Sequence, residues 1–161
     1  MSNAIGPLQK TLLFTLVVPG TVAVLLPRYL MRGYPVPAPG LLSGLGALAI
    51  LLGTFIYFRC AWEFAIRGLG TPAPIAPTKF IVVSGLYRYV RNPMYLGVAL
   101  AILGQAGLFH APRVAAYAAI MLLTAHCFVV LYEEPTLRRQ FGESYEQYRC
   151  TVPRWIPRFT K

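Results

Sequence analysis

Long apolar runs alternate with short polar segments along the chain, and this pattern predicts membrane-spanning helices. A helix needs about 20 mainly apolar residues to cross the ~30 Å hydrocarbon core of a bilayer. The runs that approach this length cover residues of about 11–30, 41–59, 94–109 and 114–132. Because the third run is short, the pattern fits either four spans or two spans and a deeply embedded hairpin. We expect an all-α, polytopic membrane protein with one domain over residues 1–161.

The connections between the runs predict how the helices pack. Only residues 110–113, HAPR, separate the last two runs, which predicts a tight antiparallel hairpin. Pro19 and Gly20 lie within the first run, where a proline removes a backbone donor and bends a helix. One face of the second run and one face of the third carry small residues, which let helices approach closely. These residues are Gly46, Ala49 or Ile50, and Gly53 in the second run, and Gly97, Ala101 and Gly104 in the third.

The composition agrees with a membrane location. Of the 161 residues, 57% are hydrophobic and 12% are charged, and the mean hydropathy of +0.57 leaves too little polar surface for a water-soluble globule. The first run is too long for a signal peptide and lacks a small-residue cleavage site, so we expect it to remain as a span. Cys60, Cys127 and Cys150 lie far apart, so their spacing indicates neither a disulfide framework nor a zinc site.

Basic residues give the chain its net charge of +10 and also predict its orientation. Lysine and arginine gather in residues 67–92 and in the tail 133–161, and such residues mark the cytosolic side of a membrane. With an even number of crossings, both termini lie on that side, and residues 31–40 and 110–113 lie towards the other. Anionic lipid headgroups account for this basic character without a nucleic-acid partner.

The first of two polar clusters follows the second apolar run. Arg59, Glu63 and Arg67 stand at positions i, i+4 and i+8, so they share one helical face and predict a ladder of ion pairs. Residues 68–80 are rich in proline and glycine and predict a rigid, non-helical segment that can close over a site beneath it.

The second polar cluster begins with Glu133 and Glu134, directly before Pro135. Proline suits the first turn of a helix and acidic groups complement the helix dipole, so capping of a new helix would explain both glutamates. The hairpin, however, brings them to the same boundary as Arg88 and Arg91. Ionisable groups at the edge of hydrocarbon are costly unless they are paired or used. Both charge signs beside several tyrosines suit a zwitterionic ligand with an aromatic group.

The cytosolic tail predicts one further helix. Leu137, Phe141, Tyr145 and Tyr148 stand at i, i+4, i+8 and i+11, which gives one apolar face. We expect this amphipathic helix to lie on the membrane or on the hairpin. It would then close the site from the cytosol.

Two motifs in these clusters resemble the isoprenylcysteine carboxyl methyltransferase and phospholipid methyltransferase superfamily. SGLYRYVRNPMYLG at residues 84–97 fits the family pattern R-[HN]-P-x-Y-x-G. EEPTLRRQFGESYEQYRCTVPRWIP at residues 133–157 fits E-E-x-x-L-x-x-x-F-G-x-x-Y-x-x-Y. The resemblance covers residues of about 70–157. It implies a multi-span helical enzyme that binds S-adenosylmethionine on the cytosolic side and takes its lipid substrate from the bilayer.

The resemblance also implies roles for individual residues. Cofactor-binding positions are Arg91, Asn92, Pro93, Tyr95, Gly97, Glu133 and Glu134 and, less directly, Tyr87, Tyr89 and Tyr145. We expect Arg91, Glu134 and Arg138 at the catalytic centre. Methyl transfer from a sulfonium is an in-line displacement in which charge disappears, so the protein chiefly holds donor and acceptor together and excludes water. No metal is expected.

The sequence leaves the methyl acceptor open. We expect an amphiphile that enters sideways, with its apolar tail beside the small-residue faces of the second and third runs. A carboxylate, as on a prenylated cysteine, needs only a positive neighbour such as Arg88 or Arg138, whereas an amine, as on phosphatidylethanolamine, needs a base. His126 and the two glutamates are the only base candidates, so a carboxylate is preferred. Asn92 favours the amine, because carboxyl methyltransferases usually have a chargeable histidine there.

Two other functions fit the sequence less well. Membrane sterol reductases share a similar motif, R-x-P-N-Y-x-G-E, but Met94 stands where the motif has asparagine and Val98 where it has glutamate. A non-catalytic scaffold would leave the two paired polar clusters without a use.

Overall fold

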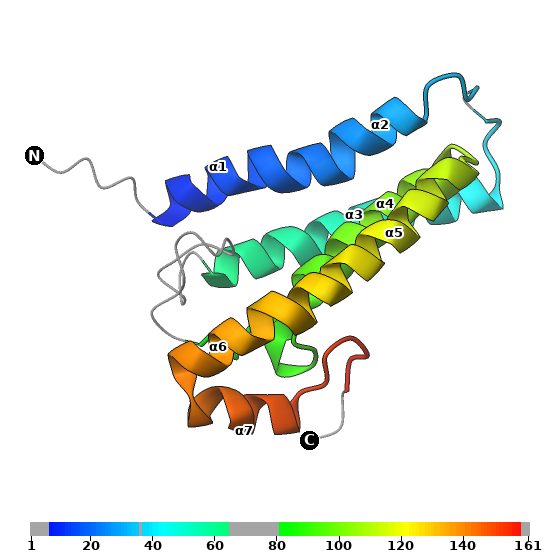
Figure 1. Cartoon of the computed structure of the whole chain (residues 1–161). Coiled ribbons are helices and arrows are strands. Elements are labelled where there is room, and N and C mark those ends of the chain that lie inside the picture. Colours follow the sequence, from blue (N-terminus) through cyan, green and yellow to red (C-terminus); the bar gives the residue numbers. More distant parts are fainter. Residues whose placement is uncertain (1–6, 36, 65–80, 159–161) are drawn as a thin grey trace, which may run out of the picture.

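The computed structural model describes residues 7–35, 37–64 and 81–158, and within these ranges it contains helices and no strand. The expected all-α class is confirmed. The elements are α1 (Pro7–Gly20), η1 (Thr21–Leu25), α2 (Leu26–Leu30), α3 (Leu41–Glu63), η3 (Gly85–Arg88), α4 (Pro93–Leu108), α5 (Pro112–Phe128), η4 (Val129–Glu133), α6 (Glu134–Phe141) and α7 (Glu143–Thr151). Here η1 and η4 are π-helical turns and η3 is a 3-10 turn. Figure 1 shows α1 and α2 along one side of the other helices, with α7 folded back at the end that carries α6.

Among the described residues, three helical stretches are long and apolar enough to span a bilayer: Leu12–Leu30, Leu41–Glu63 and Pro112–Phe141. The fourth expected span, α4, is an apolar helix of 16 residues. At 1.5 Å per residue it is about 24 Å long, shorter than the ~30 Å hydrocarbon core. It packs against both α3 and α5, and with α5 it forms the expected tight hairpin.

The small-residue faces of α3 and α4 lie directly against each other. A Cβ added to Gly46 would lie 2.6 Å from the Gly104 carbonyl oxygen, and a Cβ added to Gly104 would lie 2.7 Å from the Gly46 carbonyl oxygen. The prediction of close packing is confirmed. The expected room for a ligand tail beside these faces is wrong, because the two backbones fill that space.

Both π-helical turns end two residues before a proline. Turn η1 precedes Pro27, and η4 precedes Pro135. A proline ring collides with the carbonyl four residues earlier, and a wider turn relieves that collision. The distortion of the first span therefore follows Pro19 and ends before Pro27. The prediction of a separate helix beginning at Pro135 is wrong, since α5, η4 and α6 continue as one 30-residue stretch.

Side chains of the hairpin bind the carbonyl groups beside Pro27. Having no N–H, Pro27 cannot donate to the carbonyls of Ala23 and Val22, four and five residues earlier. Gln105 Nε2 of α4 donates to the Ala23 carbonyl at 2.8 Å, and the Tyr117 hydroxyl of α5 donates to the Val22 carbonyl at 2.8 Å. These two hydrogen bonds attach the first span to the hairpin.

The tail forms two short helices, so the prediction of a single amphipathic helix is wrong. Gly142 adopts φ +53 between α6 and α7, a conformation that costs glycine little and other residues more. Helix α7 turns back and buries Tyr145. The residues of the predicted apolar face are thus divided between α6 and α7, on the sides that face each other.

The first polar cluster lies at the end of α3. Arg59 Nη1 and Glu63 Oε1 are 2.7 Å apart, which confirms this rung of the predicted ladder. Arg67 and the segment 68–80 lie outside the described residues.

Candidate functional site

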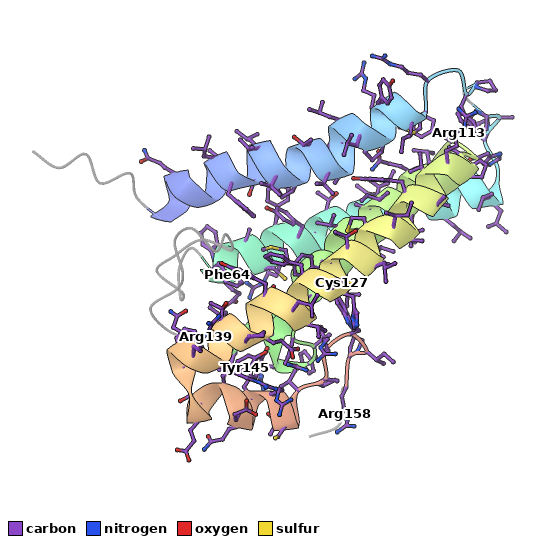
Figure 2. The ribbon with its side chains drawn as sticks, viewed as in Figure 1. Phe64, Arg113, Cys127, Arg139, Tyr145 and Arg158 are labelled. Carbon is purple, nitrogen blue, oxygen red and sulfur yellow. The ribbon has the colours of Figure 1, made fainter. Side chains whose placement is uncertain are left out.

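The two polar clusters meet where α4 begins and η4 runs into α6. Arg91 Nη1 donates to Glu134 Oε1 at 2.9 Å and to the Tyr145 hydroxyl at 3.2 Å. Both charged side chains are largely buried, with 10% of Arg91 and 8% of Glu134 exposed. Figure 2 shows Tyr145 at this end of the molecule and Arg113 at the opposite end of the hairpin.

A small, partly open cavity lies at this junction. Its lining consists of Arg91, Asn92, Val129, Glu133, Glu134, Leu137, Tyr145 and Tyr148. These residues come from the segment before α4, from η4 and α6, and from α7.

Glu134 binds two guanidinium groups at once. Arg154 donates from Nε to Glu134 Oε1 at 2.7 Å and from Nη2 to Oε2 at 3.0 Å, and Arg91 adds the third hydrogen bond. Bidentate, charge-assisted pairs of this kind are among the strongest hydrogen bonds in proteins. The bond to Glu134 raises the pKa of Arg154. Glu134 therefore has its charge compensated and its orientation fixed.

The neighbouring Glu133 has a different environment. The Tyr95 hydroxyl donates to Glu133 Oε2 at 3.2 Å, and within the described part of the chain no cation forms an ion pair with Glu133. Glu133 is therefore the acidic group of the cavity that is available to a positively charged ligand.

Arg91 retains a donor that the protein does not use. Its Nε is buried and has no hydrogen-bond partner among the described residues, an arrangement that costs ~1–3 kcal/mol. Arg91 itself also lines the cavity. Together with Glu133, the Arg91 guanidinium forms a pair of opposite charges suited to an amino-acid group.

Two tyrosines of α7 supply neutral polar groups. Burial raises the pKa of Tyr145 and the pKa of Tyr148, so both phenols stay protonated at physiological pH. The Tyr148 hydroxyl donates to the Tyr87 carbonyl at 2.8 Å and holds α7 against η3. These phenols donate or accept hydrogen bonds without adding charge.

The C-terminal segment, residues 152–158, is bound to the chain around Arg91. The Arg91 N–H donates to the Pro153 carbonyl at 2.9 Å, and the Arg158 N–H donates to the Tyr89 carbonyl at 3.0 Å. Asn92 Nδ2 donates to the Arg154 carbonyl at 3.2 Å. This pairing fixes both the segment around Arg91 and the side chain of Arg154.

Trp155 fixes the C-terminal segment to the hairpin. Its Nε1 donates to His126 Nδ1 at 3.0 Å, and its ring lies 6.3 Å from the Tyr95 ring in an edge-on arrangement. His126 is exposed on α5. Its side chain therefore connects α5 to the C-terminal segment.

The structure brings half of the expected cofactor-binding residues into the cavity. Those that line it are Arg91, Asn92, Glu133, Glu134 and Tyr145. Tyr95 contacts the cavity through Glu133, and Pro93 is the first residue of α4. Tyr89 holds the C-terminal segment through its carbonyl.

Three expected residues have other surroundings. Tyr87 is buried against Cys60. Gly97 packs on Gly53 of α3. Arg138 lies one turn after Glu134, but its Nε is 2.9 Å from Glu146 Oε1 on α7 and its side chain is 44% exposed. The structure therefore does not bring Arg138 into the cavity.

Arg154 is the site residue that sequence reasoning missed. It lies in an irregular segment without periodicity, and it reaches Glu134 only because that segment pairs with the chain around Arg91. Several arginines of the tail offered the same charge, so the sequence held no signal that distinguished Arg154.

Comparisons with known proteins indicate the family of the chain. Residues 42–144 match the family model described as phospholipid methyltransferase. The chain is also similar to the protein-S-isoprenylcysteine O-methyltransferase of Schizosaccharomyces pombe, with 36% identity over 77 residues. The match covers 48% of this chain and 33% of that protein, so the chain spans about a third of the length of its relative. No solved structure matches the chain.

Proposed function

The chain belongs to the phospholipid methyltransferase family, and from this premise we propose that it transfers a methyl group from S-adenosylmethionine to a lipid acceptor. One observation carries the proposal. The cavity combines a buried guanidinium that has an unused donor with a carboxylate that no described cation binds. These are the two partners that the carboxylate and the ammonium group of S-adenosylmethionine require.

The residues present fit S-adenosylmethionine. Arg91 would bind its carboxylate, and Glu133 would bind its ammonium group or its ribose hydroxyls. Tyr145 and Tyr148 offer neutral partners on the α7 side. When bound, the cofactor supplies a methyl group on a positively charged sulfur.

The protein's own contribution is positioning and exclusion of water. Glu134 and Arg154 fix Arg91 and the C-terminal segment, while Val129 and Leu137 give the cavity an apolar wall. Holding two reactants in line is worth several orders of magnitude in rate. No described residue has to change its protonation state when the acceptor is already an anion.

We prefer a carboxylate acceptor on a prenylcysteine-like amphiphile. Its support is the name of the fungal relative and the presence of Arg154 beside the cavity, 30% exposed and able to attract an anion. Arg154 thus takes the place that the sequence suggested for Arg88 or Arg138. The acceptor's tail would remain in the bilayer outside the α3–α4 contact, which has no room for it.

One observation favours phosphatidylethanolamine-type N-methylation as the second candidate. Glu133 lines the cavity and has the Tyr95 phenol as its hydrogen-bond partner. A carboxylate without a bound cation can take the proton that an ammonium acceptor must lose. Asn92, also in the lining, is compatible with this candidate because it carries no charge.

Cofactor binding tests the proposed function. S-adenosylmethionine should raise the melting temperature of the purified protein and NADPH should not, because a ligand that binds only the folded state stabilises it. Arg91→Ala and Glu134→Gln should each abolish the rise, while Arg113→Ala, at the far end of the hairpin, should keep it. A full response in both site variants would exclude this cavity.

A second experiment distinguishes the acceptors. Labelled S-adenosylmethionine is offered with a farnesylated cysteine analogue and, separately, with phosphatidylethanolamine. Label in the first acceptor supports carboxyl methylation, and label only in the phospholipid would favour the amine. Equal labelling of a water-soluble acceptor would argue against entry from the bilayer.

The basic residues around the cavity support a cytosolic location for it. Arg139 and Arg158 are exposed near this end of the molecule (Figure 2), and Arg88 of η3 and Arg149 of α7 are exposed or partly exposed, as the charge rule for cytosolic segments expects. Cys150 is exposed on α7. A membrane-impermeant maleimide should label Cys150 in opened cells and not in intact cells.

A further inference from the structure

Glu63 is a buried carboxylate that lies outside the cavity. It is the last residue of α3, and 4% of its surface is exposed. Its Oε1 is 2.7 Å from Arg59 Nη1 of the same helix. A buried charge is costly, so a residue that only ended a helix would not need one. The remaining contacts of Glu63 indicate what the charge does.

The carboxylate of Glu63 lies directly against a turn in the next described segment. Ser84 Oγ donates to Glu63 Oε2 at 2.6 Å. Gly85 follows with φ +59, and a Cβ added there would lie 3.0 Å from Glu63 Oε1. The turn therefore has both the hydroxyl and the glycine that allow a carboxylate to approach it closely.

This turn leads directly to Arg91. Tyr87 of η3 is buried against Cys60 of α3, and its ring meets Phe64 edge-on at 5.4 Å. On the other side, the chain is held by Tyr148 and by the Pro153 carbonyl. Residues 84–91 are thus held between the end of α3 and the C-terminal part of the molecule.

We propose that Glu63 is a positioning residue for the site: its carboxylate holds the Ser84–Gly85 turn and thereby the guanidinium of Arg91. Helix α3 has the most extensive contact with α4. Glu63 therefore connects residues 84–91 to the most closely packed part of the bundle. The cofactor readout below rests on the proposed function, whereas the exchange readout does not.

Hydrogen exchange of the full chain without ligand tests the contact itself. Within residues 84–91, the N–H groups of Tyr87, Tyr89, Val90 and Arg91 have backbone acceptors. Ser84→Ala and Glu63→Gln should each speed exchange at these amides by about tenfold, the scale of one charge-assisted hydrogen bond. Exchange in α4 and α5 should stay unchanged. Ser84→Thr, which keeps the hydroxyl, should restore slow exchange.

Calorimetric titration with S-adenosylmethionine supplies the second readout. Both variants should raise Kd by about tenfold, and Ser84→Thr should return it towards the wild-type value. Glu146→Gln, which breaks an exposed ion pair away from the cavity, should leave Kd unchanged.

The outcomes are distinguishable. Wild-type exchange at residues 84–91 in both Ser84→Ala and Glu63→Gln would overturn the proposal. Faster exchange throughout α4 and α5 would also overturn it, in favour of a general role in stability. If the wild-type protein does not bind S-adenosylmethionine, the proposed function fails, and the exchange experiment still decides the role of Glu63.

Discussion

Glu134 connects three parts of the chain at the scale of a single residue. It begins α6, it binds Arg91 from the segment before α4, and it binds Arg154 from the C-terminal segment. Breaking a buried ion pair by removing one partner typically costs about 3–5 kcal/mol, because the other charge stays buried. Of Glu134, Arg91 and Arg154, Arg154 has the most exposed side chain. Its removal leaves Glu134 still paired with Arg91, so it leaves the least uncompensated charge.

We therefore predict that Arg154→Ala weakens cofactor binding without unfolding the protein. The variant loses two hydrogen bonds to Glu134, and an increase of about tenfold or more in Kd is expected. Calorimetry measures this change. Fluorescence of Trp155 in a Trp62→Phe background should report detachment of the C-terminal segment. Arg149→Ala is the matched control, and equal effects of the two variants would contradict the prediction.

Two glycines of α3 form a matched pair for a packing test. A Cβ on Gly53 would lie within 3.0 Å of the α4 backbone, whereas a Cβ on Gly44 would meet nothing within 4 Å. Gly53→Ala should destabilise the protein by about 1–3 kcal/mol through overpacking. Gly44→Ala should stabilise it by up to about 1 kcal/mol through helix propensity. Unfolding in mixed detergent micelles measures both, and stabilisation by both would show that α3 and α4 are separated.

At the scale of elements, Pro27 creates a site of attachment. It removes one backbone donor from the first span, and the hairpin supplies Gln105 and Tyr117, which donate to the carbonyls of Ala23 and Val22. Inside a membrane no water is available to satisfy such groups. The irregular part of the first span therefore fixes its position along the membrane normal.

We predict that Gln105→Leu and Tyr117→Phe each destabilise the attachment of the first span. Polar contacts between helices in membranes contribute about 0.6–2 kcal/mol each, and the double variant should lose more than either single one. Cross-linking between α2 and α5 should fall in parallel. Tyr132→Phe, which keeps its ring stacked on Phe128, serves as the control and should have no effect.

For the molecule as a whole, the C-terminal segment completes the site. Removing residues 152–161 should leave membrane insertion and the packing of α4 against α3 and α5 intact, because these helices contact one another directly. Cofactor binding should be lost, since Arg154 and the partner of the Arg91 N–H are gone. A truncated protein that binds the cofactor normally would exclude this role.

The sequence predicted the parts of this molecule that depend on local pattern and short connections. The hairpin follows from a four-residue link, and the meeting of Arg91 with Glu134 follows from the hairpin. The close contact of α3 and α4 follows from spaced glycines. Each of these conclusions needs only helix periodicity and topology.

The rest depended on contacts between distant segments. The helix through Pro135 persists because a π-helical turn precedes the proline, and periodicity does not signal such a turn. The tail divides at Gly142 because α7 can then bury Tyr145 against Arg91. Arg138 carries the same charge as Arg154, but it pairs with Glu146 on α7, so charge alone did not distinguish the two arginines.

The shortness of α4 makes the protein sensitive to the thickness of its bilayer. Helix α4 is about 24 Å long, whereas the Pro112–Phe141 stretch is about 45 Å long. In a thick membrane, α4 is too short for the hydrocarbon core, so either the turn at His110 or the first residue of α4 lies below the headgroups. Arg91 lies just before that first residue. Because such hydrophobic mismatch costs fractions of a kcal/mol per Å, cofactor affinity should fall as acyl chains lengthen. Titrations in vesicles of increasing acyl-chain length would measure this change in affinity. The composition of the membrane would then regulate cofactor binding.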